Sequence, residues 1–168
     1  MRKSVLMLVL MVGIVLLTSL VIKAEGDEAV GGISAEIIEP ISISNVEELS
    51  FGILASPLES LNLAELNPES GSVTYDSFNE GYPTAASFEV TGTGDSGYRE
   101  ELPDSTTLFL MEDNDNIHVN SFTSSLENNI GSLSDGFDSF TIGATLVVNS
   151  GQTPGTYHGE FTVLATYE

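Results

Sequence analysis

The sequence contains no cysteine and no tryptophan, and only 4 Lys and Arg residues stand against 25 Asp and Glu, for a formal net charge of −21. The absence of cysteine excludes disulfide bonds, thiol redox chemistry and cysteine-ligated zinc or iron–sulfur sites. The scarcity of basic residues argues against electrostatic binding to a nucleic-acid backbone or to anionic lipid. We therefore expect neither nucleic acid nor a membrane surface among the partners of the acidic part of the chain.

Most of the basic residues lie near the N-terminus, and only Arg99 follows position 23. Residues 1–24 have the order of an export signal, with a positive start, an uncharged apolar run and a small residue before an acidic stretch. The run is also long enough to span a bilayer, so an uncleaved anchor is the alternative. Both interpretations predict a secreted or cell-surface protein. Cleavage would leave a chain without lysine, which excludes Schiff-base chemistry and lysine-linked covalent assembly.

Beyond residue 24, short β-type runs alternate with clusters of Gly, Pro, Asn, Asp and Ser. This pattern is typical of an all-β sandwich or barrel. No linker or internal repeat divides the chain, so we predict one β domain over residues 39–168, preceded by a short segment, residues 25–38. The strands are expected at residues 33–44, 49–54, 71–76, 86–93, 98–102, 106–111, 117–123, 139–149 and 157–167.

The clearest strand signal comes from residues 139–149 and 157–167, where apolar residues occupy every second position. Such alternation gives each strand one apolar face, and the intervening Gly and Pro residues favour a turn, so we predict one long hairpin. The leucines and prolines of residues 55–70 predict either one helical turn or a packed loop. Residues 124–138 are rich in Ser, Asn, Gly and Asp and are predicted to form an exposed loop.

The sequence shows no pattern that indicates catalysis. Adjacent acidic pairs occur at positions 47–48, 100–101 and 112–113. Neighbouring residues of a strand point to opposite faces, so these pairs do not form the facing carboxylates of a glycoside hydrolase. His118 and His158 lie in no motif that indicates a nucleophile. We predict a non-catalytic protein without a cofactor, and an extracellular hydrolase is the least favoured alternative.

One acidic turn deserves comparison with calcium sites. Residues 112–116 place several oxygen-bearing side chains between two expected strands, and Ca²⁺ prefers six to eight oxygen ligands. The EF-hand pattern fails, because the loop lacks its glycine at the sixth position and its glutamate at the twelfth. A polar hairpin turn has the same composition and is the favoured interpretation. If Ca²⁺ binds to this chain, Asp113 and Asp115 are the predicted ligands.

Seven segments share an order and spacing that are typical of one family. They are Ile41-Ser42-Ile43, Leu49-Ser50-Phe51-Gly52, Gly71-Ser72-Val73, Phe88-Glu89-Val90-Thr91-Gly92, Tyr98 to Pro103, Ile142 to Leu146 and Gly155 to Phe161. Together they resemble the secreted domain of unknown function 4402 family and, through it, fimbrial subunits of the chaperone–usher and spore-coat-U kind. The resemblance implies an immunoglobulin-like (pilin-like) antiparallel β-sandwich.

In fimbrial subunits the terminal strand borders a groove that the N-terminal extension of the next subunit fills. The resemblance therefore implies a structural subunit of a surface fibre, pilus or matrix, whose partners are further copies or other surface subunits. The terminal strand would supply the acceptor residues Gly155, Tyr157, Phe161, Val163 and Tyr167. Many fimbrial subunits carry a disulfide that this chain lacks.

Residues 25–38 are the candidate donor segment, and its apolar positions are Val30, Ile33, Ala35 and Ile37. The alternative, slightly favoured, is that residues 33–44 form the first strand of the same domain. A second functional hypothesis is a monomeric surface module that binds carbohydrate or calcium. Aromatic side chains exposed on one cluster of loops would favour carbohydrate, and the residues to inspect are Phe78, Tyr82 and Phe137.

Overall fold

The computed structural model describes residues 26–111, 113 and 115–168. The predicted export signal, residues 1–24, lies outside the described residues. Apart from one 3-10 turn, the regular structure of the described part consists of β-strands, which confirms the predicted all-β, sandwich-like fold. In the same part of the chain, no helix is long and apolar enough to cross a membrane.

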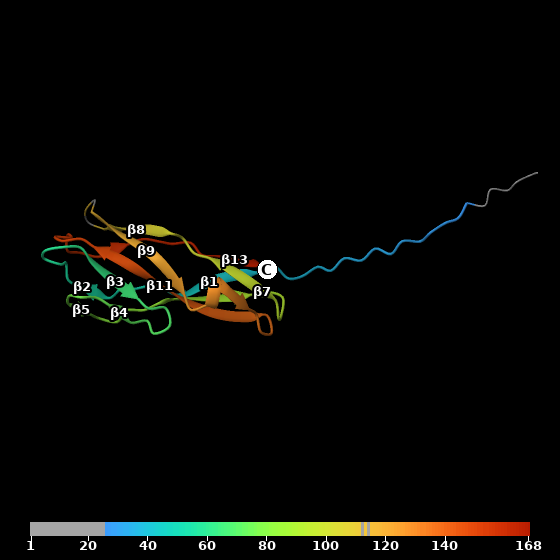
Figure 1. Cartoon of the computed structure of the whole chain (residues 1–168), viewed down its shortest axis with the longest axis horizontal. Helices are drawn as coiled ribbons and strands as arrows, with labels where there is room; N and C mark the ends of the chain where they lie inside the picture. Colours follow the sequence, from blue (N-terminus) through green and yellow to red (C-terminus); the bar gives the residue numbers. More distant parts are fainter. Residues whose placement is uncertain (1–25, 112, 114) are drawn as a thin grey trace, which may run out of the picture. The chain divides into compact units, whose positions relative to one another are not determined.

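The strands pair in antiparallel fashion throughout. Within the described residues the largest sheet has the order β1-β6-β11-β9-β8-β12, and β3 pairs with both β11 and β4 (Figure 1). A second sheet has the order β10-β7-β13, and β2 pairs with β5. The elements are β1 (Ser42–Glu47), β2 (Ile53–Leu54), β3 (Asn62–Leu66), β4 (Val73–Thr74), β5 (Asn79–Glu80), β6 (Ala86–Thr91), β7 (Gly97–Glu101), β8 (Ser105–Leu110), β9 (Asn116–Ser124), η1 (Glu127–Asn129), β10 (Ile130–Ser132), β11 (Phe137–Val148), β12 (Tyr157–His158) and β13 (Leu164–Tyr167).

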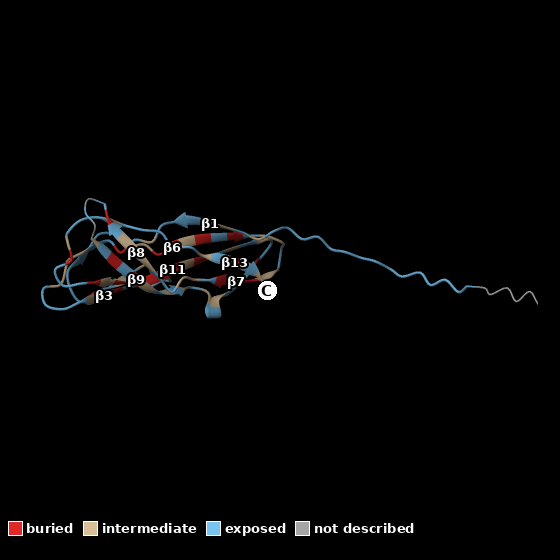
Figure 2. Ribbon diagram, turned by 90° about the horizontal axis from the view of Figure 1, so that it is seen from above, coloured by how far each residue is buried: buried red, intermediate tan, exposed pale blue. Residues whose placement is uncertain are grey.

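The twelve-residue strand β11 organises the large sheet. Along one edge it pairs first with β6 and then with β3, and along the other edge it pairs with β9. Its predicted apolar face is confirmed, because every second residue from Phe140 to Val148 is buried. Figure 2 shows the same alternation as stripes of different burial along β6.

Two clusters of buried side chains form the interior. The first core lies over β3, β9 and the second half of β11, and consists of Phe51, Ala64, Leu66, Tyr75, Ala85, Ile117, Val119, Ala144, Leu146 and Val148. The second core lies between the large sheet and the three-stranded sheet, and consists of Ala86, Phe88, Val90, Tyr98, Leu133, Phe140, Ile142 and Ala165. Because β7 and β13 contribute to the second core together with β6 and β11, the two sheets pack face to face as in a sandwich.

The predicted hairpin between residues 139–149 and 157–167 is wrong. The terminal run is divided between the two sheets, since β12 pairs with β8 and β13 pairs with β7. Both edges of β11 are already occupied by β6, β3 and β9, so no edge is left for a hairpin partner. Gly159 lies at the crossing, where an added Cβ would be 2.7 Å from the Thr107 carbonyl oxygen. The apolar alternation therefore identified a strand face but not its partner.

Two segments predicted as irregular also contain strands. Residues 55–70 form β3 rather than a helical turn, because β6 leaves the edge of β11 after Ile142 and β3 takes its place. Residues 124–138 are not an exposed loop, since they contain η1 and β10, and Leu133 is buried in the second core. Sequence pattern missed both because tertiary pairing decides the structure of such short segments.

The predicted first strand at residues 33–44 is also wrong. β1 begins at Ser42, and residues 26–41 belong to no strand. Pro40 has no N–H to donate to a sheet, which accounts for a boundary at this point. The chain from Ile37 to Glu168 forms one compact unit, and this unit contains all of the strands described above.

Candidate functional site

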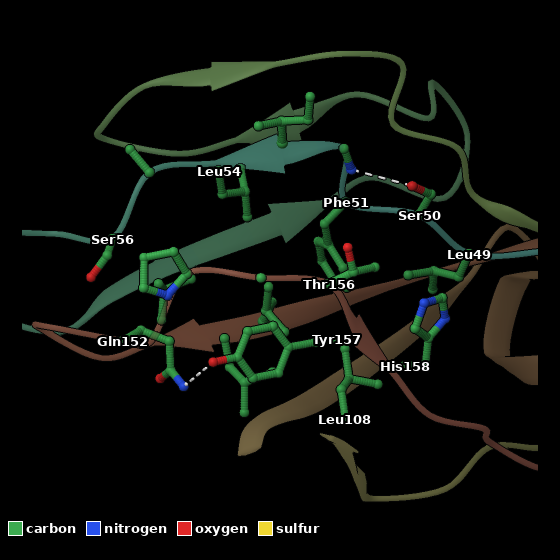
Figure 3. A pocket seen from close by; sticks show the side chains of 18 of the residues that line it. Leu49, Ser50, Phe51, Leu54, Ser56, Leu108, Gln152, Thr156, Tyr157 and His158 are labelled. Carbon is green, nitrogen blue, oxygen red and sulfur yellow. Dashed lines mark hydrogen bonds between the residues drawn. The ribbon is translucent and has the colours of Figure 1, made fainter. Parts of the chain in front are cut away.

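The large sheet ends in β1 on one side and in β12 on the other, and its two end strands border a cavity. In the described chain β1 pairs only with β6, and β12 pairs only with β8, so each has one edge without a strand partner. A cavity of about 1020 Å³ lies between the chain that follows β1 and the chain around β12. We call this cavity the groove (Figure 3).

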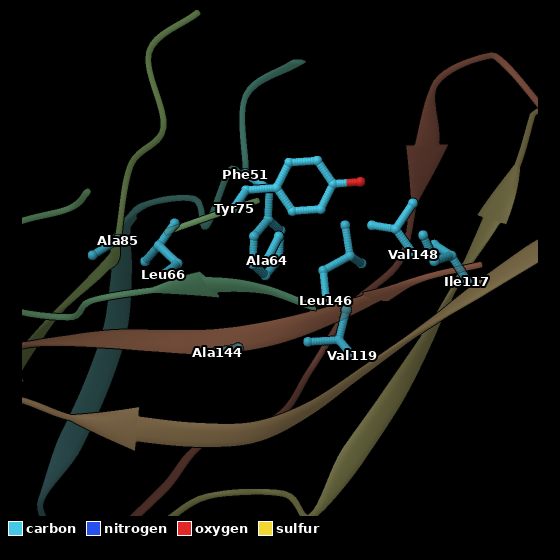
Figure 4. Packing of buried hydrophobic residues seen from close by; sticks show 10 residues of the cluster. All are labelled: Phe51, Ala64, Leu66, Tyr75, Ala85, Ile117, Val119, Ala144, Leu146 and Val148. Carbon is cyan, nitrogen blue, oxygen red and sulfur yellow. The ribbon is translucent and has the colours of Figure 1, made fainter. Parts of the chain in front are cut away.

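The groove has two walls and an apolar floor. Residues 47–56 form the first wall, and residues 152–158 form the second. In Figure 3 Phe51 and Leu54 of the first wall face Tyr157 of the second. The floor consists of Leu108, Ile117, Leu146 and Val148. Figure 4 shows that Ile117, Leu146 and Val148 belong to the first core, so the floor of the groove is continuous with the hydrophobic interior.

The first wall is held by pairing with Thr84 and with β5. Ser50 and Thr84 exchange two backbone hydrogen bonds of 2.8 and 2.9 Å, and β2 pairs with β5. Gly52 turns the chain between these two contacts with a φ of 74°. An added Cβ at Gly52 would lie 2.9 Å from the Glu80 carbonyl oxygen, so the turn requires glycine.

A polar network fixes the second wall. Gln152 is buried, and its Nε2 donates hydrogen bonds to Asp115 Oδ2 at 3.1 Å and to the Asn116 carbonyl oxygen at 3.0 Å. The Tyr157 hydroxyl donates to the Thr153 carbonyl oxygen at 2.7 Å. The backbone N–H groups of Thr153 and Asn116 donate to the Asp115 carboxylate at 3.3 and 2.8 Å. These bonds connect the loop before β12 to the start of β9.

The same network bears on the predicted calcium ligands. Hydrogen bonds from Thr153 and from the Asn116 N–H lower the pKa of Asp115, so its carboxylate is charged and already bonded to the protein. Among the described residues, no group of three or more acidic or histidine side chains is arranged to hold a metal ion. Glu112 and Asn114 lie outside the described residues, and binding of Ca²⁺ by Asp113 and Asp115 stays a prediction.

The five predicted acceptor residues lie in three places. Gly155 and Tyr157 line the groove. Phe161 and Val163 pack against the second core, with the Phe161 ring 5.0 Å from the ring of Phe122. The Tyr167 hydroxyl donates instead to the Glu39 carbonyl oxygen at 2.9 Å. Sequence reasoning missed the whole first wall, although Leu49 to Gly52 carried part of the family resemblance.

The predicted donor residues are exposed. Val30, Ile33 and Ile37 have exposed fractions of 99%, 101% and 96%, and Ala35 is exposed too. Residues 26–38 contain no strand and no buried side chain. Branched apolar side chains strongly prefer burial, at about 1.5–3 kcal/mol each. The segment therefore combines the composition of a strand with an unsatisfied apolar surface.

Other residues singled out from the sequence do not converge on a second site. Phe78 and Tyr82 flank β5, whereas Phe137 begins β11 in another sheet. His118 and His158 are both exposed. Glu100 and Glu101 point to opposite sides of β7 as predicted, since Glu100 is buried and Glu101 is exposed.

A family model described as Domain of unknown function (DUF4402) matches residues 41–167. No curated protein and no solved structure matches the chain. The matched region includes both walls of the groove and every strand from β1 to β13. Because the match covers well over half of the sequence, the chain belongs to the DUF4402 family.

Proposed function

We propose that the protein is a non-catalytic extracellular subunit that assembles into a surface fibre, pilus or matrix by non-covalent strand complementation. The observation that supports this function is the combination of a groove that has an apolar floor with an exposed N-terminal segment that belongs to no strand. The partner is another copy or a related surface subunit. An exported location is part of the proposal, since it rests on residues 1–24 of the sequence.

Strand addition at a sheet edge supplies the physical basis. A free edge offers backbone donors and acceptors, and pockets beside it accept alternate side chains of the added strand. Ile33, Ala35 and Ile37 lie at a spacing of two and therefore share one face of a strand. Val30 falls on the opposite face unless Gly31-Gly32 shifts the register by one residue. At about 3.3 Å per residue, residues 26–38 extend over roughly 40 Å, which suffices to line the first wall.

Point variants of the donor segment test the proposal. In the chain from Glu25 onward, we expect Ile33→Asp to reduce fibre formation at least tenfold, because a charge would enter the apolar groove. Ser34→Asp is the matched control, since it adds the same charge on the opposite face of the segment. Sedimentation velocity and electron microscopy at high ionic strength provide the measurement. Equal fibre yields for the two variants, or a monomeric wild-type chain, would contradict strand complementation.

Cysteine trapping tests the same contact directly, because the natural chain has no cysteine to compete. A mixture of Ala35→Cys and Thr156→Cys chains is expected to form a disulfide-linked dimer, since Thr156 lines the groove. Glu89→Cys replaces Thr156→Cys in the control, because Glu89 is exposed on β6 and lies outside the groove. Equal cross-linking in the two mixtures would count against occupation of the groove.

A monomeric carbohydrate-binding module is the second candidate. Its support is the exposure of Tyr82 and Phe78, at 94% and 56%, on either side of β5 in the sequence. Exposed aromatic rings can stack on sugar rings. The test is a glycan array, in which saturable binding that Tyr82→Ala abolishes would favour this function over assembly.

A further inference from the structure

The base of the N-terminal segment is bonded to two side chains that are distant in sequence. The Glu39 N–H donates to Thr93 Oγ1 at 2.9 Å, and the Tyr167 hydroxyl donates to the Glu39 carbonyl oxygen at 2.9 Å. The Thr93 N–H in turn donates to the Tyr167 hydroxyl oxygen at 2.7 Å. We call Glu39, Thr93 and Tyr167 the root clasp. Both backbone polar groups of Glu39 are thereby engaged.

Several features of the sequence build this clasp. Tyr167 lies opposite Tyr98 in the register of β13 with β7, and it packs against the second core, so its ring position is fixed. An added Cβ at Gly92 would overlap the Tyr167 hydroxyl, so only glycine admits the ring here. Tyr167 of β13 and the consecutive residues Gly92 and Thr93, which follow β6, thus converge on one backbone position.

The clasp also sets the direction of the chain. Ser42 is paired with Thr91 at the start of β1, and three residues earlier the Glu39 N–H is bonded to the Thr93 side chain, just beyond the end of β6. Residues 39–42 therefore continue the line of β1. Pro40 reinforces this direction, because it restricts its own φ and keeps the residue before it extended.

The direction matters because β1 pairs only with β6 in the described chain, and its last residue, Glu47, lines the groove. A segment that reversed near residues 38–41 would pair with β1 of its own domain and close its own groove. Tight hairpin turns of this kind need a positive φ at their first central residue. Pro40 is unsuited to such a turn, and Glu39 would have to break its bonds with Thr93 and Tyr167 to enter one.

We propose that the root clasp and Pro40 keep the N-terminal segment out of the groove of its own domain, so that it fills only the groove of a second copy. The proposal rests on the proposed function. It adds a structural feature that favours assembly with a second copy over self-closure, which is the insertion of residues 26–38 into the groove of their own domain. A monomer then keeps both its donor segment and its groove available until it meets another copy.

Variants of the clasp provide the test in the chain from Glu25 onward. Tyr167→Phe and Thr93→Val remove hydrogen bonds of the clasp, and Tyr82→Phe removes an exposed hydroxyl as the matched control. A double variant, Glu39→Asn with Pro40→Gly, supplies a pair that favours tight hairpins. Hydrogen exchange of residues 26–38 in dilute monomer reports self-closure, and sedimentation reports fibre yield.

We expect no protection of residues 26–38 in monomers of the wild type and of Tyr82→Phe. The double variant should raise the hydrogen-exchange protection of residues 26–38 at least tenfold and lower the fibre yield at least tenfold. Tyr167→Phe and Thr93→Val should also raise this protection and lower the fibre yield. A purely structural role would instead lower the melting temperature of the clasp variants without protecting residues 26–38. That result would overturn the proposal.

Addition of a synthetic peptide of residues 26–38 to a chain that starts at Glu39 separates the two proposals. If the peptide binds but the clasp variants exchange and assemble like the wild type, the clasp proposal fails and strand complementation stands. If the peptide does not bind and the wild type forms no fibres, both proposals fail. If the peptide binds, and if residues 26–38 are protected in monomers of the clasp variants, both proposals are supported.

Discussion

Residues 26–38 and residues 157–167 have similar sequence patterns but different environments. Both alternate apolar and polar residues, as a half-buried strand does. In the terminal run Ala165 is buried, and Tyr157, Phe161, Val163 and Tyr167 are half-buried. In the N-terminal segment Ile33 and Ile37 are fully exposed. The pattern therefore states which face of a strand is apolar, but not whether a partner is present.

The availability of sheet edges explains the difference. The terminal run finds two edges, on β8 and on β7, and it changes sheet between them. The N-terminal segment, residues 26–38, lies immediately before Glu39 of the root clasp in the sequence. Within the described chain it pairs with no sheet edge. Among the strand edges without a partner in the described chain are those of β1 and β12, and residues of both strands line the groove. The described chain thus has an exposed apolar segment before β1 that belongs to no strand, and it has a groove lined by residues of two strands that each lack a second partner.

Glycine substitutions give the sharpest contrast between the two regions. Gly159→Ala should lower the free energy of unfolding by about 2–3 kcal/mol, because its Cβ would lie 2.7 Å from the Thr107 carbonyl oxygen and from Leu108 Cδ2. Gly32→Ala should leave the stability of the monomer unchanged, because no atom lies within 4 Å of its Cβ position. Urea denaturation of the two variants measures the difference. Equal stabilities would show that the terminal crossing is not tightly packed.

Ionisation of Glu100 should weaken the sheet that holds the terminal strand. Glu100 is 2% exposed and lies opposite Ala165 of β13. Asn129 donates to its Oε1 at 3.1 Å, but among the described residues its Oε2 has no hydrogen-bond partner. Burial raises the pKa of Glu100 above its usual 4.5. Because the folded state favours the protonated acid, the stability from this group is complete below pH 4.5 and is lost as pH rises through the raised pKa.

Glu100→Gln should therefore gain about 1–2 kcal/mol relative to the wild type between pH 4 and pH 8, since an amide does not ionise. Thermal denaturation at several pH values measures this difference. Glu101→Gln is the control, because Glu101 is exposed and its variant should follow the wild type at every pH. A difference that does not change with pH would contradict a raised pKa at Glu100.

Those features of the fold that depend on the local sequence pattern were predictable. The apolar face of β11 and the all-β class follow from alternation and from turn residues, which act over a few positions. The partner of each strand depends on which edges are free, and this is a property of the whole sheet. For that reason the hairpin was wrong, and β3 was missed at the edge that β6 leaves open.

Of the two walls of the groove, only the second wall was predictable from the sequence. Gly155 and Tyr157 were predicted from the terminal strand, and both line the groove. The opposite wall, residues 47–56, follows a strand but pairs through short contacts with residues 80 and 84. Such contacts leave no periodic signal in the sequence. The role of Tyr167 differed from expectation because its ring is directed by pairing of β13 and by the space at Gly92.

The smallest expected effect concerns Asp115, which lies just before β9 and accepts hydrogen bonds from Gln152 and Thr153 of the loop before β12. Its pKa is lowered by hydrogen bonds from Thr153 and Asn116, so the folded state favours the ionised form. The stability from this group is present at neutral pH and is lost as pH falls through the lowered pKa. Asp115→Asn should therefore lower the melting temperature by a few degrees at pH 7, and the difference from the wild type should shrink as the pH falls below 3.8.

Asp113→Asn separates this structural role from calcium binding. Asp113 is exposed and is the other predicted Ca²⁺ ligand, so the melting temperature of its variant in the presence of a chelator is the reference for its response to Ca²⁺. If Ca²⁺ binds at this turn, millimolar Ca²⁺ should raise the melting temperature of the wild type but not that of Asp113→Asn. An Asp115→Asn defect that persists without change at pH 3 would contradict the hydrogen-bonding role. In that case the terminal run would be anchored by its apolar face alone, and the contrast with residues 26–38 would rest on edge pairing only.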